Sequence, residues 1–204
     1  MMQLALVNPD GKIGVQNGVF TMCGNRGQID DGRKLIRQYR HQHWIYCVTS
    51  ALCDPGEFMT AGTYTDLFFL DEATALAAGH RPCGRCNKKR FDNFIHGWKE
   101  TFPSFEGGPD EIDLVLASER MEPDGGKKVF LTESNDVPEG AMVRVDGDAF
   151  LLANQMMYPW TLTGYGRPLQ IPSTRVEVLT PPSVVLILRR RNFRLPLTNL
   201  VMSW

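Results

Sequence analysis

The sequence predicts an α+β protein with a small metal-binding module in its N-terminal half and a β-rich C-terminal part. Three observations favour this architecture. Residues 63–98 combine a strand, two helices and a C-x-x-C pair. A Pro- and Gly-rich stretch at residues 102–109 is typical of a boundary, and short strand-like runs dominate after residue 127. We therefore expect two parts, residues 1–102 and residues 110–204.

The chain begins with two short strand-like segments inside Met1–Val15, separated by a turn at Pro9-Asp10-Gly11. The loop Gly24-Asn25-Arg26-Gly27 follows Cys23. Its glycines allow positive φ and the close approach of another group, so it is either a plain turn or an anion-binding loop.

A helix is expected next at Asp30–Gln42, and a strand at Trp44–Thr49. The helix is predicted because its apolar residues fall on one side, with charged residues on the other. Those apolar residues are Leu35, Ile36 and Tyr39.

The central stretch opens with a predicted strand at Thr63–Leu70, which is aromatic, β-branched and apolar. Asp71 suits the N-cap of a following alanine-rich helix, because its carboxylate can accept from the first backbone N–H groups. Gly79 suits the residue just past the helix end, and Pro82 prevents continuation of the helix.

Cys83 and Cys86 form the C-x-x-C pair that precedes a second helix. Such a pair is compatible with a redox dithiol, with half of a zinc site, or with two buried small residues. The zinc interpretation needs further donors, and Cys47 and Cys53 lie upstream. The helix after the pair is predicted from apolar residues spaced along one face: Phe91, Phe94, Ile95 and Trp98.

Residues 44–98 resemble the amino-terminal metal-binding domain of the Ada alkylation-response protein. The resemblance is carried by Ile45-Tyr46-Cys47 and by LFFLDEATALAAGHRPCGRC. It implies a Zn²⁺ ion held by Cys47, Cys53, Cys83 and Cys86. It also implies a role in DNA repair, in which Cys47, the equivalent of the family's first cysteine, takes a methyl group from a phosphotriester.

The gap between Cys47 and Cys53 is longer than in that family. His80 or Cys23 is therefore an alternative fourth ligand in place of Cys53.

The overall charge is balanced, with a formal net charge of −1 over 204 residues. This argues against unspecific attraction to nucleic acid, but basic residues gather around the C-x-x-C pair. They form either a solvated helix face or a patch that contacts the phosphates of DNA or another nucleic acid. These residues are Arg81, Arg85, Lys88, Lys89 and Arg90.

The cysteine pattern and the first residues of the chain predict the cellular compartment of the protein. Five cysteines spaced as a metal site favour a reducing cytoplasm. The first residues lack the features of a signal peptide, and no apolar run is long enough for a membrane span. We expect a cytoplasmic protein without membrane contact.

The C-terminal part is predicted to begin with a helix at Pro109–Met121, followed by a partly closed barrel. Trp160, Tyr165 and Arg167 fall on an expected loop and serve either core packing or stacking of a base or sugar. The expected strands are Lys127–Thr132, Ala141–Val145, Ala149–Leu152, Arg175–Leu179 and Val184–Leu188.

Three functions remain open from the sequence. The first is a zinc protein that contacts nucleic acid. The second is an enzyme or methyl acceptor that uses Cys47 or a zinc-bound water, with Asp54, Glu57 or Asp71 as base. The third is an interaction module with structural zinc. The sequence contains none of the nucleotide-binding loops or hydrolase motifs that were sought. Because the zinc-based alternative needs no such motif, the sequence leaves open whether the protein is an enzyme.

Overall fold

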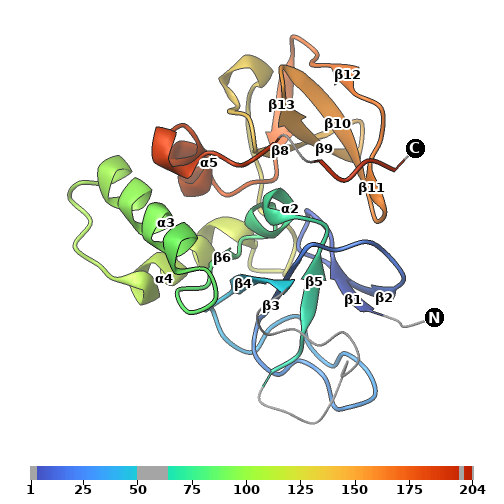
Figure 1. The fold of residues 1–204 in the computed structure, drawn as a ribbon, viewed down its shortest axis with the longest axis vertical. Helices are drawn as coiled ribbons and strands as arrows, with labels where there is room; N and C mark the ends of the chain where they lie inside the picture. The colour runs from blue at the N-terminus through green and yellow to red at the C-terminus, as the bar shows by residue number, and fades with distance from the viewer. Residues whose placement is uncertain (1–3, 50–63, 198–199, 204) are drawn as a thin grey trace.

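Two β-sheets lie one above the other, with the short helix α2 (Glu72–Ala77) between them and in contact with both (Figure 1). The computed structural model describes residues 4–49, 64–197 and 200–203. The architecture is α+β, as the sequence predicts. None of the helices in this described part has the length and apolar character needed to cross a membrane.

The first sheet has the strand order β2-β1-β5-β3-β4-β6. Strand β5 runs parallel to β1, and β6 runs parallel to β4, whereas the remaining neighbours are antiparallel. The strands expected at the chain start and at residues 44–49 and 63–70 are confirmed. The bounds are β1 (Leu4–Val7), β2 (Ile13–Gln16), β3 (Met22–Asn25), β4 (Ile45–Val48), β5 (Leu67–Phe69) and β6 (Arg81–Pro82).

The alanine-rich helix α2 has the expected caps. The side chain of Asp71 accepts from the backbone N–H of Thr74 at 2.8 Å, and Gly79 has φ +85° just past the helix. A Cβ atom at Gly79 would lie 2.6 Å from Cδ of Arg120, so the glycine also allows that side chain to approach. The other helices are α3 (Lys88–Thr101), α4 (Pro109–Arg120) and α5 (Pro182–Leu188).

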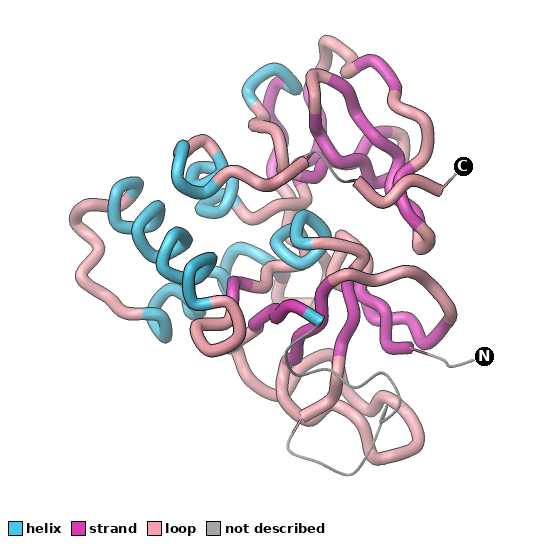
Figure 2. The backbone as a smooth tube through the Cα atoms, in the orientation of Figure 1, coloured by secondary structure: helices cyan, strands magenta, loops and turns pink. Residues whose placement is uncertain are grey.

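The predicted helix at Asp30–Gln42 is wrong, because this segment is a series of turns that Figure 2 shows as loop. Carboxylates at its start bind nearby backbone N–H groups instead of starting a helix: Oδ1 of Asp30 accepts from Gly32 at 2.8 Å, and Oδ1 of Asp31 accepts from Lys34 at 2.9 Å. Gly32 has φ +83°, which a helix cannot accommodate.

The second sheet has the order β11-β10-β9-β8-β13-β7, and β12 pairs with β10. The strands are β7 (Phe130–Glu133), β8 (Met142–Val145), β9 (Asp148–Ala153), β10 (Met156–Thr161), β11 (Gly164–Tyr165), β12 (Leu169–Gln170) and β13 (Arg175–Val178). Four of the predicted strands correspond to β7, β8, β9 and β13.

Two expectations for the C-terminal part are corrected. Val184–Leu188 belongs to α5, because Pro182 starts a helix and the carboxylate of Glu119 accepts from the Ser183 backbone at 3.1 Å. The stretch expected as a loop forms the β10–β11 hairpin. Tyr165 is fully buried there, and its hydroxyl donates to Asp71 at 2.8 Å.

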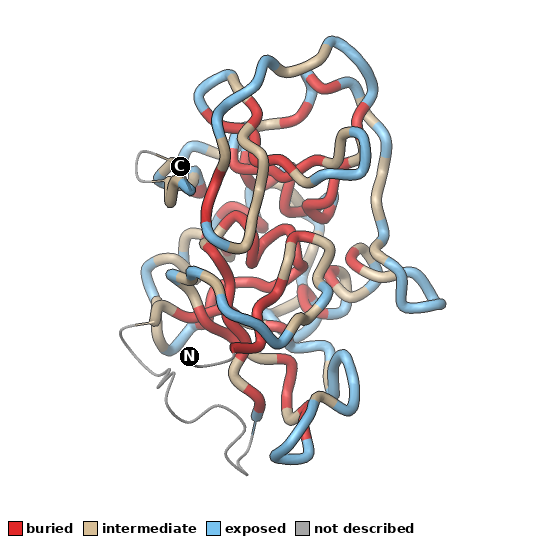
Figure 3. Tube along the Cα trace, turned by 90° about the vertical axis from the view of Figure 1, so that its right-hand side faces the viewer, coloured by how far each residue is buried: buried red, intermediate tan, exposed pale blue. Residues whose placement is uncertain are grey.

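Buried residues form a band that runs through both halves of the molecule (Figure 3). The largest hydrophobic cluster joins strands of the first sheet, helices α2 to α5 and strands of the second sheet. Trp98 of α3 and Phe193 are among its largest members. The core therefore includes residues from both sides of the predicted boundary, while the boundary itself stays a prediction.

Candidate metal centre

Cysteines from two segments far apart in the sequence converge beside β4 and β6. Cys47 belongs to β4, Cys83 follows β6, and Cys86 lies in the turn before α3. Their Sγ atoms all lie within 4.8 Å of one another. The structure thus brings together three of the four predicted zinc ligands.

Strand pairing explains how Cys47 meets the C-x-x-C turn. Strand β6 pairs with β4 so that Pro82 lies opposite Tyr46, and the backbone N–H of Cys83 donates to the Tyr46 carbonyl at 2.9 Å. The residues that follow on each strand, Cys47 and Cys83, are therefore adjacent. On the other side of β4, a Cβ atom at Gly24 would lie 2.2 Å from the Ile45 carbonyl oxygen. Only glycine allows β3 to pair so closely with β4 there.

The turn holds Cys83 and Cys86 as a pair of thiols. The N–H of Asn87 donates to the Cys83 carbonyl at 3.3 Å, and the Asn87 side chain caps α3. The two sulfurs are 3.5 Å apart, far beyond the roughly 2.05 Å of a disulfide. Two thiolates on one tetrahedral zinc, each about 2.3 Å from the metal, would be about 3.8 Å apart. The observed spacing fits shared coordination.

The pKa values of the three thiols are shifted in different directions. Burial acts to raise the pKa of Cys83, but backbone N–H groups of Cys86 and Arg85 stabilise its thiolate, and the net result is a pKa below the usual value. Burial raises the pKa of Cys47 and of Cys86. Because adjacent thiolates repel one another, a bound cation is the means by which proteins keep all of them deprotonated.

The cysteines line a small pocket of about 180 Å³. Cys47 is 6 % exposed and Cys83 is 8 % exposed. Arg85, Asp66 and Tyr64 also line this pocket. The sulfurs therefore border a space that a small group could occupy beside the Arg85 side chain.

The structure places the three candidates for the fourth ligand differently. Cys53 lies outside the described residues. His80 is fully buried, and its Nε2 accepts from Nε of Arg26 at 3.2 Å, so this nitrogen is engaged. Cys23 lies opposite Cys47 on β3, but it is disulfide-bonded. The fourth ligand stays a prediction.

Of the three residues proposed as a base for a zinc-bound water, the structure describes only Asp71. Asp54 and Glu57 lie outside the described residues. Asp71 is the N-cap of α2, and its two oxygens accept from Thr74 and from the Tyr165 hydroxyl, each at 2.8 Å. In this position Asp71 supports the fold.

The basic residues around the cluster fall into two groups. Arg81 is 7 % exposed, and its guanidinium binds both oxygens of Asp113, at 2.8 and 2.7 Å. Arg90 bonds Glu72 at 2.5 Å and lies over the Phe193 ring at 3.8 Å. These two side chains are therefore used inside the protein. The exposed members are Arg85, Lys88 and Lys89.

A second group of potential metal ligands, which the sequence interpretation missed, comprises His43, Asp110 and Asp113. Nδ1 of His43 lies 2.9 Å from Asp113 and 3.5 Å from Asp110. Arg81 already binds both oxygens of Asp113, so this group is an ion-pair network. No sequence signal links residue 43 to residues 110–113; the contact depends on the packing of α4.

Comparison of the chain with protein-family models, with curated proteins and with solved structures gives no match. The geometry of the site is therefore the basis for its interpretation. It shows a cluster of three free cysteines that could hold a metal ion.

Proposed function

We propose that this protein is a zinc-binding protein in which Cys47, Cys83 and Cys86 ligate one Zn²⁺ ion. The observation that carries the proposal is the convergence of their sulfur atoms within 4.8 Å from two segments that are far apart in the sequence, β4 and the C-x-x-C turn. Thiolate-rich sets favour zinc among the common divalent ions, and tetrahedral zinc takes four ligands. Three thiolates leave the fourth position of such a site to a water molecule or another small ligand that enters the pocket beside the sulfurs.

Zinc would join β4, β6 and the start of α3 through their cysteines. These segments are short, and β6 has only two residues, so hydrogen bonds alone hold them weakly. Because folding is what brings these thiolates together, the free energy of metal binding at this site adds to the free energy of folding. The proposed primary role of the metal is therefore structural.

Metal analysis tests this proposal. Purified protein should contain about one zinc per chain, and Cys47→Ser and Cys83→Ser should each lose most of it. Val48→Thr changes a neighbouring residue of the same strand without touching a sulfur, so it serves as the matched control and should keep the metal. Wild-type protein that neither contains nor takes up zinc would contradict the proposal.

A second candidate function is contact with nucleic acid through the basic surface beside the cluster. Arg85, Lys88 and Lys89 are exposed at the start of α3. Arg90 also donates to the Arg194 carbonyl at 3.2 Å, which brings the basic C-terminal segment with Arg191 next to α3. This adjacency of two basic segments supports a phosphate-binding surface.

Fluorescence anisotropy with a DNA duplex at several salt concentrations tests this candidate. Changing Arg85, Lys88 and Lys89 to Gln should weaken binding, and the salt slope should fall by about 0.9 for each phosphate that the variant no longer neutralises. Arg175→Gln, which removes an exposed positive charge from β13 of the second sheet, is the control. Equal binding by the triple variant and wild type would refute the candidate.

Methyl transfer to Cys47 is a further alternative. It is supported by the pocket that Cys47 shares with the exposed Arg85, whose guanidinium suits a phosphotriester backbone. Incubation with methylated DNA should then add one methyl group to Cys47, detected by mass spectrometry of the peptide. An unmodified Cys47 in zinc-loaded protein would exclude this activity.

A further inference from the structure

A second site lies on the other side of β4, where two buried arginines share one indole ring. The guanidinium carbons of Arg26 and Arg120 lie 3.7 and 3.8 Å from the Trp44 ring centroid. Arg26 is 1 % exposed and Arg120 is 3 % exposed. Two like charges buried around one side chain are costly unless a negative charge compensates them.

The described part of the chain compensates these charges only in part, since the carboxylates of Asp113 and Asp10 act on Arg120 and Lys127 without forming ion pairs with them. No carboxylate there lies within ion-pairing distance of Arg26, Arg120 or Lys127. Asp10 is nearby but bonds Arg144, and Asp113 is held by Arg81.

Carbonyl oxygens satisfy several of the donors without neutralising their charge. Arg26 Nη1 donates to Gly11 at 2.9 Å, and Arg120 donates to Gly79 and Gln42 at 3.1 and 2.8 Å. Nη2 of Arg26 is buried and has no hydrogen-bond partner. Arginine does not lose its proton in proteins, so this donor stays charged and unsatisfied.

The side chain that carries the unsatisfied donor borders a cavity. Arg26, Arg120 and Lys127 all border a space of about 350 Å³, whose floor includes Gly11. Gly11 has φ +79°, a backbone conformation that favours glycine, and a Cβ atom there would lie in contact with Nη2 of Arg26 at 3.6 Å. Burial, together with the smaller effect of the neighbouring arginine charges, lowers the pKa of Lys127 to about 7.

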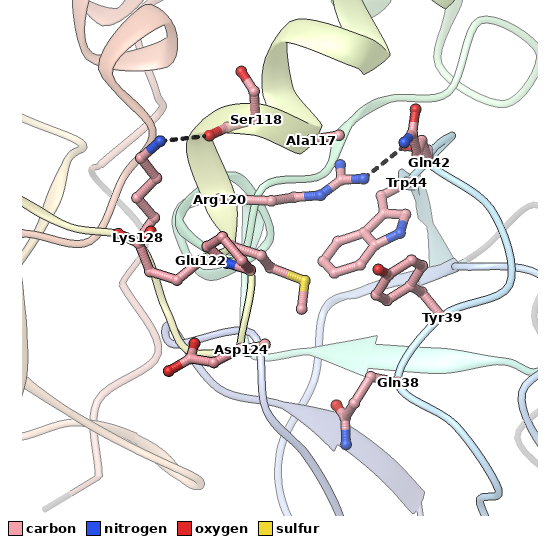
Figure 4. A pocket seen from close by; sticks show the side chains of 13 residues that line it. Gln38, Tyr39, Gln42, Trp44, Ala117, Ser118, Arg120, Glu122, Asp124 and Lys128 are labelled. Atoms are coloured by element: carbon pink, nitrogen blue, oxygen red, sulfur yellow. Dashed lines mark hydrogen bonds between the residues drawn. The ribbon is translucent and has the colours of Figure 1, made fainter.

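This inner cavity adjoins an outer pocket of about 650 Å³. Both are bordered by Gln38, Trp44 and Arg120. In Figure 4 Arg120 extends towards Gln42 beside Trp44 and Tyr39, along the wall of the outer pocket. Met121 and Gln38 also line this pocket, and Glu122, Asp124 and Lys128 lie on the side away from Trp44 and Tyr39 (Figure 4). A neutral organic group suits it better than a second anion.

We propose that the inner cavity binds the phosphate group of a small phosphorylated molecule, and that the rest of the molecule lies in the outer pocket. Arg26 and Arg120 supply charged donors to the phosphate oxygens, and Lys127 adds a third donor. Tyr39 and Trp44 border the space for the organic group.

Titration of the zinc-loaded full chain tests the proposal. Inorganic phosphate, ribose 5-phosphate and adenosine monophosphate are titrated at matched ionic strength, with ribose, adenosine and citrate as comparisons, by calorimetry and by ³¹P NMR. Saturable binding of the phosphate compounds, tighter for a monoester than for inorganic phosphate, is the expected result. The tighter monoester identifies the organic group that the outer pocket prefers.

Variants locate the binding. Lys127→Gln should weaken phosphate binding by about tenfold, and Arg26→Lys, which keeps the charge but loses the planar donor set, should weaken it severalfold. Lys99→Gln is the matched control, because Lys99 is an exposed lysine of α3 that borders neither the inner cavity nor the outer pocket. Circular dichroism confirms that each variant is folded, and exposed Lys12, which borders the inner cavity, provides a variant with little risk to folding.

Three results would overturn the proposal: no saturable binding of any phosphate compound by wild-type protein, preference for citrate over phosphate, or equal affinity in wild type and the Arg26, Lys127 and Lys12 variants. Equal affinity for inorganic phosphate and both monoesters would overturn the assignment of the outer pocket.

Discussion

Arg81 and Asp113 form a buried ion pair with two hydrogen bonds, from Nε to Oδ1 at 2.8 Å and from Nη2 to Oδ2 at 2.7 Å. The pair joins β6 to α4 two residues before Cys83. Its exposure is 9 % for the Arg81 side chain and 0 % for Asp113. It fixes the strand that presents Cys83 to the other cysteines.

Breaking this pair on one side should destabilise the protein strongly. Arg81→Met leaves a buried carboxylate with only His43 as partner, and we expect a loss of about 3–5 kcal/mol in the free energy of unfolding. Urea denaturation measures this loss. The double variant Arg81→Met/Asp113→Leu should recover part of the stability because it leaves no unpaired charge; a double variant no more stable than Arg81→Met would argue against the ion-pair explanation.

Removal of zinc should loosen the segments that carry the cysteines before the rest of the fold. Under a strong chelator we expect faster hydrogen exchange in β4, in residues 81–87 and at the start of α3, because the metal contributes to their stability. Strands β8 and β9 of the second sheet serve as internal reference. Uniform exchange in both sheets after chelation would contradict a local structural role.

Lys127 should make stability depend on pH in the alkaline range. Its pKa is lowered by burial to about 7 in the folded protein, against an ordinary value of 10.5. Between these values the unfolded state binds more protons, so the free energy of unfolding rises with pH through this group. Lys127→Met should abolish that part of the rise. Denaturation of both proteins from pH 7 to 10 gives the difference, and parallel curves would contradict the lowered pKa.

Tyr165 should link the second sheet to α2. Its fully buried hydroxyl donates to Asp71, the N-cap of that helix. Tyr165→Phe leaves one oxygen of a buried carboxylate unpaired, and we expect a loss of about 1–3 kcal/mol. Tyr64→Phe, at a residue that is 41 % exposed, should change the unfolding free energy little. Thermal unfolding of the two variants measures this difference. Equal unfolding midpoints for Tyr165→Phe and Tyr64→Phe would contradict a stabilising contact between Tyr165 and Asp71.

Local sequence signals predicted the elements that depend on neighbouring residues. Asp71 and Gly79 determine the two ends of α2, since capping acts through side chains and φ angles within one turn. The same local reasoning failed at residues 30–42, where Asp30 and Asp31 bind nearby backbone N–H groups. It also failed at Val184–Leu188, where the capping by Glu119 comes from another helix.

The sequence alone therefore determined the α+β class, the cap residues and the pairing of Cys83 with Cys86 in one turn. Tertiary structure decided that Cys47 joins them, that Arg81 and Arg90 are used internally, and that Arg26 and Arg120 meet over Trp44. The physical reason is range: caps and turns act over a few residues, whereas these contacts depend on strand register and on the packing of distant helices.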